Sequence, residues 1–227
     1  MTAQLIDYFS QFVTPQRLTR MRQVVAERTR YLTVVVEDIF QPHNASAVLR
    51  TCDGFGVQDV HIIENRNRYR VNPGVELGTA QWLTLHRYRE AANNTPHAIR
   101  SLREAGYRVI ATTPHTDHVE LDCFDLGAGP AAFLFGNELD GLSHDALAHA
   151  DDHVVIPMYG FVESLNISVC AAVVLHHLMQ KLRTSGIAYQ TSVQEQHEIM
   201  LGWLRSSIGR APELERAFHA RRREMQS

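Results

Sequence analysis

The chain has 227 residues, of which 44% are hydrophobic and 21% are charged. A chain of this length buries roughly 70% of its unfolded surface, so we expect a sizeable core. No apolar run reaches the roughly 18 residues that a membrane helix needs, and the N-terminus lacks the basic flank and apolar stretch of a signal peptide. These features exclude a membrane-spanning protein and indicate a soluble, cytoplasmic one.

The formal net charge of −3 is unevenly distributed along the chain. Residues 1–31 carry a net charge of +3, residues 181–227 carry +3, and the residues between them carry −9. An acidic middle with two basic ends favours an anionic partner held by the ends, with the chemistry placed in the middle. Solvated helix surfaces would give the same pattern.

The first predicted element is a basic amphipathic helix that ends near Glu27. Thr14 is a good cap residue, Pro15 suits the first helical position, and apolar residues follow at helical spacing. The β-branched run over residues 32–37 then predicts a buried parallel strand. A helix that opens at Asn44 follows this strand.

The same plan repeats through the middle of the chain. We expect strands over residues 59–64, 107–112, 131–136 and 153–157, with a further helix over residues 98–105. Strands that alternate with helices predict an α/β fold, with a mostly parallel sheet and helices on both faces.

A long apolar helix is predicted after Asn166, ending near Ser185. Two more helices, over residues 194–208 and 213–223, close the chain. We therefore expect three parts, which are a basic helical arm (1–31), an α/β core (32–184) and a helical, basic C-terminal extension (185–227).

The glycine loops that bind phosphates in many α/β proteins are missing. Gly54-Phe55-Gly56 begins such a motif, but the third glycine position is Asp59 and the pair follows a helix, which is typical of a helix C-cap. Neither GxxxxGK[ST] nor GxSxG occurs. A dehydrogenase, a P-loop NTPase and an α/β-hydrolase are therefore all disfavoured.

Cysteine and histidine do not form a convincing metal or disulfide pattern. Cys52, Cys123 and Cys170 are widely spaced, so we expect reduced, partly buried thiols. His115, His118 and Glu120 have suitable ligand types, but they lie in a loop where ligand geometry is not assured. We expect no metal site.

Polar residues crowd the ends of three predicted strands, where open α/β sheets bind ligands. The three segments are PHNASAVLR (42–50), LFGNELDGL (134–142) and IPMYGFVESLNIS (156–168). Taken singly, each has an ordinary structural explanation, because Asn44, Ser164 and Asn166 can cap helices and Glu138 can lie in a turn.

Together and in this order, the three segments resemble the motifs of the SpoU branch of the SPOUT RNA 2′-O-ribose methyltransferases, over roughly residues 32–184. The resemblance implies a C-terminal trefoil knot, a rare exception to unknotted topology. It also implies that S-adenosylmethionine binds in that knot. The basic arm and the helical extension are similar to those of family members that methylate guanosine 18 of tRNA.

The matching positions imply roles for individual residues. The family's catalytic scheme makes Arg50 the group that activates the ribose, although a guanidinium is a poor base. Arg50 would instead act as a base only when bound to phosphate, or would position the phosphate and stabilise the developing oxyanion. The resemblance implies that this arginine, the ribose and the cofactor loops are oriented by Asn44, Glu138, Ser164 and Asn166, and that the cofactor site is lined by Thr112, Gly136, Ile156, Met158 and Leu165.

The resemblance also implies partners. The long helix after the third motif packs against a second subunit in this family, and here it is apolar on more than one face, which favours a homodimer. Because the core is acidic, tRNA affinity is expected to come from basic residues at the two ends, which are Arg17, Arg20, Arg22, Arg28, Arg30, Arg221, Arg222 and Arg223. Arg66, Arg68 and Arg70 in a core loop would add to it.

Other functions stay open at this stage. With the same methyl-transfer chemistry, the alternative target is ribosomal RNA or another position in tRNA. A catalytically silent RNA-binding protein with the same scaffold is the alternative from a different class, and a nicotinamide oxidoreductase is the third.

Overall fold

The computed structural model describes residues 1–113 and 119–224, and this part of the chain divides into two compact units. One unit is the continuous segment Thr29–Tyr189. The other combines Met1–Arg28 with the chain from Gln190 onwards. The N-terminal arm and the C-terminal extension therefore belong to the same compact unit, although about 160 residues separate them in the sequence.

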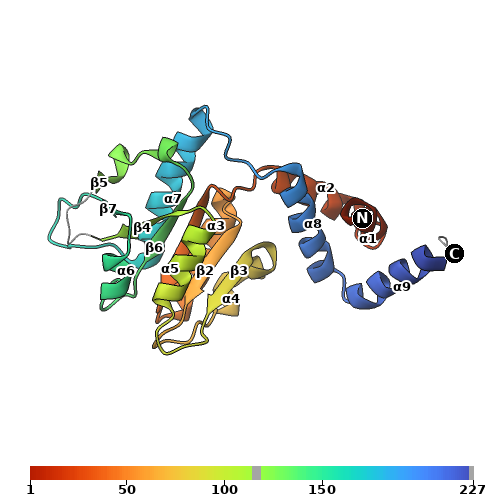
Figure 1. Cartoon of the computed structure of the whole chain (residues 1–227), viewed down its shortest axis with the longest axis horizontal. Coiled ribbons are helices and arrows are strands. Elements are labelled where there is room, and N and C mark those ends of the chain that lie inside the picture. The colour runs from red at the N-terminus through yellow and green to blue at the C-terminus, as the bar shows by residue number, and fades with distance from the viewer. Residues whose placement is uncertain (114–118, 225–227) are drawn as a thin grey trace. The chain divides into compact units, whose positions relative to one another are not determined.

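The larger unit is built on one sheet, whose seven strands in the described residues all run parallel (Figure 1). The strand order is β3-β2-β1-β6-β4-β7-β5. The strands span β1 (Leu32–Glu37), β2 (Asp59–Ile63), β3 (Thr84–Tyr88), β4 (Arg108–Thr112), β5 (Val119–Glu120), β6 (Ala131–Phe135) and β7 (Asp152–Val155). This arrangement confirms the predicted α/β fold with a parallel sheet.

The central strands β1 and β6 are buried on both faces, as their largely apolar runs predict. Val34 and Val36 of β1 pack into one core, beneath α3 (Pro42–Phe55) and α7 (Ile167–Thr184). Val35 points the other way, into a second core beneath α5 (Thr95–Glu104) and α6 (His144–Ala148). Helices thus cover both faces, which confirms that part of the prediction.

The helix after β1 begins earlier than expected, at Pro42 and not at Asn44. Proline at the first helical position has no N–H to lose and a φ suited to the helix, so it sets the start. Asn44 consequently lies inside the first turn, and its side chain is free of the capping role. The helix ends at Phe55, and the left-handed backbone of Gly56 (φ 86°) confirms the C-cap interpretation of the glycine pair.

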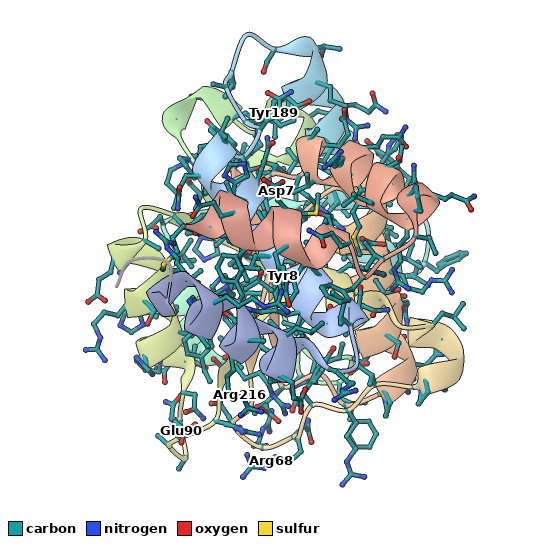
Figure 2. The ribbon with its side chains drawn as sticks, turned by 90° about the vertical axis from the view of Figure 1, so that its right-hand side faces the viewer. Asp7, Tyr8, Arg68, Glu90, Tyr189 and Arg216 are labelled. Carbon is teal, nitrogen blue, oxygen red and sulfur yellow. The ribbon has the colours of Figure 1, made fainter. Side chains whose placement is uncertain are left out.

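The smaller unit consists of helices. They are α1 (Thr2–Ser10), α2 (Pro15–Ala26), α8 (Val193–Ser207) and α9 (Ala211–Glu224). Thr14 caps α2 as predicted, and Ser192 and Glu195 form a capping box at the start of α8. Tyr8 of α1, labelled in Figure 2, lies 5.3 Å from Phe218 of α9 between ring centroids, so the first and last helices touch directly.

Sequence patterns missed α1, the edge strand β3 and several short elements, which include α4 (Pro73–Glu76). In β3 (TLHRY) no side chain is fully buried and three of the five are polar, because this strand lies at the edge of the sheet beside β2. Such a strand has no continuous apolar run to reveal it. The trefoil knot that the resemblance implies stays a prediction.

Candidate active site

A cavity of about 500 Å³ lies at the carboxyl ends of β4, β6 and β7. It is lined by the residues that follow these strands, which is where parallel sheets place ligand sites. All five residues that the sequence assigns to a cofactor site are among the lining residues, namely Thr112, Gly136, Ile156, Met158 and Leu165. The Thr112 hydroxyl donates to the Leu134 carbonyl oxygen at 2.7 Å, and this bond joins β4 to β6 at the cavity.

Gly136 shows why the loop after β6 has its sequence. A Cβ atom at this position would lie 2.0 Å from the backbone carbon of Gly141 and 2.2 Å from the backbone nitrogen of Leu142. The loop closes on itself through hydrogen bonds between the backbones of Asn137 and Gly141, at 3.0 and 3.1 Å. Only glycine permits this close approach, which shapes one wall of the cavity.

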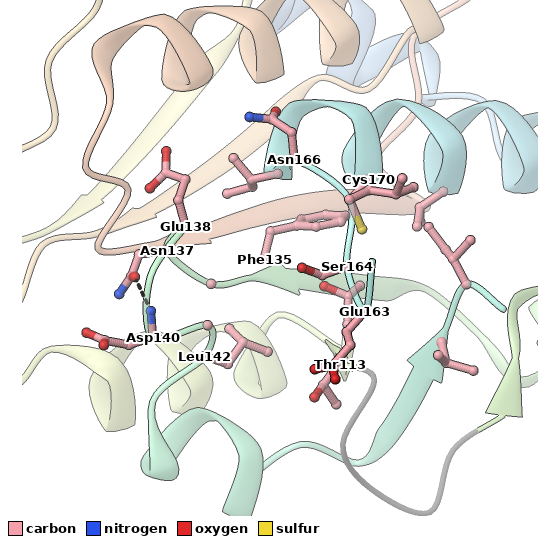
Figure 3. A pocket seen from close by; sticks show the side chains of 18 of the residues that line it. Thr113, Phe135, Asn137, Glu138, Asp140, Leu142, Glu163, Ser164, Asn166 and Cys170 are labelled. Carbon is pink, nitrogen blue, oxygen red and sulfur yellow. Dashed lines mark hydrogen bonds between the residues drawn. The ribbon is translucent and has the colours of Figure 1, made fainter. Parts of the chain in front are cut away.

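Three polar side chains from separate segments meet at the edge of the cavity. Asn44 Nδ2 donates to Glu138 Oε1 at 2.6 Å, and Asn166 Nδ2 donates to Asn44 Oδ1 at 3.2 Å. Figure 3 shows Glu138 on the loop after β6 and Asn166 at the segment that leads into α7. Because β1 and β6 are paired strands, the segments that follow them emerge side by side. We call Asn44, Glu138 and Asn166 the amide–carboxylate network.

The network holds both amides in one orientation. Asn166 also caps α7, where its Oδ1 accepts from the backbone N–H and the hydroxyl of Ser168. The Asn44 amide accepts from Asn166 through its oxygen and donates to Glu138 through its nitrogen, so each end of this amide has a fixed partner. Ser164 lines the same cavity.

Arg50 stands apart from this network. It is exposed on α3, and its Nη1 donates to the Val75 carbonyl oxygen at 3.0 Å, at the short helix α4. The structure therefore joins three of the five residues with a proposed catalytic or orienting role in the network and places Ser164 in the cavity lining, whereas the Arg50 guanidinium is bound at α4.

Two buried carboxylates at the end of β1 support the site, and sequence reasoning missed both. Glu37 accepts hydrogen bonds from the hydroxyls of Thr95 and Ser143 and from the Ser143 backbone N–H. Ser143 directly follows the loop after β6 and caps α6, so Glu37 anchors the exit of that loop. An acidic pair that ends a buried apolar strand, here Glu37-Asp38, is the signal that marks such a support.

Cys170 is the thiol among the cavity-lining residues. Burial raises its pKa from the usual value to about 11, so the thiol is protonated at neutral pH. A nucleophilic role for Cys170 is therefore unsupported, and all three cysteines are free, as the sequence predicts.

The predicted RNA-contacting arginines differ in accessibility. Arg17, Arg20, Arg22 and Arg221 are exposed, and Arg222 is partly buried. Arg30 is bound to Asp59, with 2.8 Å between Nε and Oδ2. The side chain of Arg223 lies outside the described residues.

Arg28 is a correction to the sequence prediction. Its side chain is 1% exposed, and its guanidinium lies 5.2 Å from the ring centroid of Trp203, in the core of the smaller unit. The guanidinium is therefore engaged in a cation–π contact within the folded unit. Arg28 therefore presents no surface to an RNA phosphate.

The weak metal pattern cannot be followed in full, because His115 and His118 lie outside the described residues. Within residues 1–113 and 119–224, no group of three or more His, Cys, Asp or Glu side chains is arranged to hold a metal ion. No helix in the same ranges has the length and apolar character needed to cross a membrane.

The chain is similar in sequence to one protein family over most of its length. The model of the SpoU rRNA Methylase family matches residues 31–176. A tRNA (guanosine(18)-2′-O)-methyltransferase of Borreliella burgdorferi is 41% identical over 203 residues, which cover 89% of this chain and 91% of the relative. The match is longer than the α/β core (32–184), so it extends into the flanking segments.

Solved structures show the same fold. The crystal structure of the Aquifex aeolicus TrmH/SpoU tRNA modifying enzyme matches with a TM-score of 0.75 at 28% identity, over 85% of this chain and 97% of that one. The SpoU methyltransferase AviRb of Streptomyces viridochromogenes, solved in complex with the cofactor AdoMet, matches with a TM-score of 0.55 at 22% identity. It covers 72% of this chain and 62% of its own, and it supports the fold alone.

Proposed function

The chain belongs to the SpoU methylase family, and from this we propose that it methylates the 2′-hydroxyl of guanosine 18 in tRNA, with S-adenosylmethionine as the methyl donor. The observation that carries the proposal is the amide–carboxylate network at the rim of the cavity. It lies where a ribose outside the cavity would meet a cofactor inside it. The similarity of 89% of the chain to a tRNA (guanosine(18)-2′-O)-methyltransferase supports tRNA as the substrate.

The cavity suits S-adenosylmethionine by size and by chemistry. About 500 Å³ is in the range of cofactor sites, and the lining combines backbone-rich loops with apolar side chains such as Ile156, Met158 and Leu165. The cofactor has no pyrophosphate, so it needs no glycine loop at a helix N-terminus. The closed loop at Gly136 and the 156–165 segment would hold it.

The protein's own residues supply orientation and charge. When bound, the cofactor would supply an electrophilic methyl group whose sulfur leaves as a neutral thioether, and the ribose oxygen would have to approach this methyl in line while its proton passes to solvent. Holding the reactants in this geometry can supply several of the roughly 7–11 kcal/mol attributed to well-placed reactants. We assign orientation of the ribose to Asn44, Glu138 and Asn166, and contact with the cofactor-side loop to Ser164.

Arg50 is the residue we assign to the adjacent phosphate and to the negative charge that develops on the ribose oxygen. A guanidinium keeps its proton and presents a planar fork of donors, so it suits this role better than that of a base. Arg50 is exposed and its guanidinium is bound to the Val75 carbonyl at α4, which leaves the side chain accessible to a polyanion.

We also propose a homodimer that forms through α7. Val169 and Val173 are exposed on this helix, one turn apart, although most of its other apolar side chains are buried in the core. Sedimentation of the chain should give a dimer at micromolar concentration, and Val173→Glu should shift it to monomer. Val193→Glu, the same change at an exposed valine on α8, is the control that should leave the dimer intact.

The direct test of the function is the methylation of tRNA by the purified chain. Incubation of an unmodified tRNA transcript with labelled S-adenosylmethionine, followed by mapping of 2′-O-methyl groups, should place one methyl at nucleotide 18. Methylation at another tRNA position or only in ribosomal RNA would replace the substrate but keep the chemistry. Cofactor binding without transfer to any RNA would contradict the proposal.

A further inference from the structure

Phe40 is a large apolar side chain that the structure leaves 61% exposed beside the amide–carboxylate network. Its backbone N–H donates to Glu138 Oε2 at 3.3 Å, while the other oxygen of the same carboxylate accepts from Asn44. Its neighbour Ile39 is buried in the core. The phenyl ring is thus held outward, next to the residues assigned to orient the ribose.

A strained turn fixes this position. Asp38 has a left-handed backbone (φ 52°), which is unfavourable for a residue that carries a Cβ. Its buried carboxylate compensates by accepting the backbone N–H groups of Asn65, Arg66 and Asn67, at 2.7, 2.8 and 3.2 Å. Pro42 then fixes the backbone at the start of α3. The exposure of Phe40 therefore follows from a well-anchored backbone.

The surroundings of Phe40 favour a polyanion over an apolar protein surface. The loop that Asp38 anchors carries Arg66, Arg68 and Arg70, all exposed (Figure 2 labels Arg68). Arg66 is paired with Asp140 at 2.8 Å. An exposed ring between a polar network and a basic loop matches the stacking platforms of single-stranded nucleic acid sites, which combine aromatic faces with positive charge.

We infer that the Phe40 ring stacks on the base of the nucleotide whose ribose is methylated. This inference rests on the proposed function and identifies a residue that recognises the target nucleotide. The base is bonded to the ribose carbon next to the one that carries the reacting hydroxyl. A ribose held at the network therefore brings its base within reach of Phe40, provided that the base is unstacked from its RNA neighbours, as in loops that proteins recognise.

The test combines two changes, one in the protein and one in the RNA. Phe40→Leu keeps an apolar side chain but removes the aromatic face, and Phe40→Tyr keeps the face. Each variant methylates a full tRNA transcript and a transcript with an abasic ribose at nucleotide 18, which retains its 2′-hydroxyl. Single-turnover rates and RNA affinities are measured at one salt concentration.

On the full transcript, Phe40→Leu should lose about tenfold or more in the single-turnover rate divided by the RNA dissociation constant, and Phe40→Tyr should stay close to the wild type. On the abasic transcript, the wild type and Phe40→Leu should be equal, because no base remains to stack. Affinity for S-adenosylmethionine, measured by calorimetry, should be the same in all three proteins, since Phe40 lies outside the cavity lining.

Two outcomes would overturn the inference. The first is that Phe40→Leu loses the same factor in methylation rate on both transcripts. The second is that Phe40→Leu sediments differently from the wild type, which would assign the ring to a protein contact. A wild-type chain that fails to methylate nucleotide 18 would refute the proposed function instead, so the two failures are distinguishable.

Discussion

At the scale of single residues, the site depends on contacts that a one-atom change disrupts. Gly136→Ala would drive a Cβ into the backbone of Gly141, at 2.0 Å. We expect the free energy of unfolding to fall by about 2–4 kcal/mol and binding of S-adenosylmethionine to be lost. Urea denaturation and calorimetry measure the two effects.

Gly54→Ala is the matched control for that change. Gly54 lies within α3 with nothing inside 4 Å of its would-be Cβ, so alanine should leave the stability unchanged or raise it by up to about 1 kcal/mol. Equal behaviour of the two variants would show that the close approach at Gly136 is unimportant.

Arg50 provides a second test at this scale. If its guanidinium acts on the ribose and phosphate, Arg50→Ala should lower turnover about 10²–10³-fold while affinity for S-adenosylmethionine stays within a few-fold. Arg50→Lys should be nearly as damaging, because a point charge cannot reproduce the planar fork. Arg100, which is exposed on α5, offers a control arginine whose replacement by alanine should leave turnover intact. Parallel loss of cofactor binding in Arg50→Ala would move this residue out of its assigned role.

At the scale of elements, the edge formed by β2 and β3 contains a pH-sensitive cluster. His61 is buried, stacks on His86 with 4.4 Å between ring centroids, and shares a hydrogen bond with the Tyr88 hydroxyl at 3.0 Å. Burial, followed by the charge on His86, lowers the pKa of His61 from 6.5 to about 4. The unfolded chain therefore binds a proton at this side chain between about pH 6.5 and 4, whereas the folded chain does not.

The sign of this effect follows from the excess protons bound by the unfolded chain. Stability should rise with pH across that window, so lowering the pH from 7 to 5 should cost about 2 kcal/mol through His61 alone. His61→Gln should remove most of this dependence in urea denaturation, after allowance for a constant loss of packing. An unchanged pH dependence in this variant would show that the cluster does not titrate as inferred.

At the scale of the whole molecule, charge is segregated between the two units. The smaller unit has ten basic and seven acidic residues, and the larger has twelve and eighteen. If tRNA binding releases counterions through the exposed arginines of α2, log affinity should fall steeply with log salt. Replacement of Arg17, Arg20 and Arg22 by glutamine should reduce that slope by about 2–3.

Substitution is preferable to deletion of the arm, because Leu5, Phe9 and Met21 are buried in the unit that α1 and α2 form with α8. Arg103→Gln is the control, since Arg103 already pairs with Asp151 in the larger unit. Filter binding between about 50 and 200 mM salt gives the slopes. Identical slopes for all three proteins would show that the basic helix α2 is only a solvated surface.

The amino-acid sequence by itself determined the α/β class and most of the longer helices and strands, and the resemblance of its three polar segments pointed to five of the residues that line the cavity. Unbroken β-branched runs identify buried parallel strands, and capping residues identify helix ends, because both signals are local. The polar segments after β1, β6 and β7 were also visible, since functional residues interrupt an otherwise regular pattern. The sequence wrongly assigned Arg28 to RNA contact, because local charge does not reveal whether a side chain is covered.

Only the tertiary structure decided which of these residues meet. The contact of Asn44 with Glu138 depends on the pairing of β1 with β6, which are separated by about 95 residues in sequence. The closed loop at Gly136, the buried Glu37 and the strained turn at Asp38 depend on backbone approaches between distant segments. The union of the two chain ends in one unit likewise requires long-range packing of α1 on α8 and α9. Such contacts depend on strand order and on the burial of distant apolar faces, neither of which any short stretch of sequence encodes.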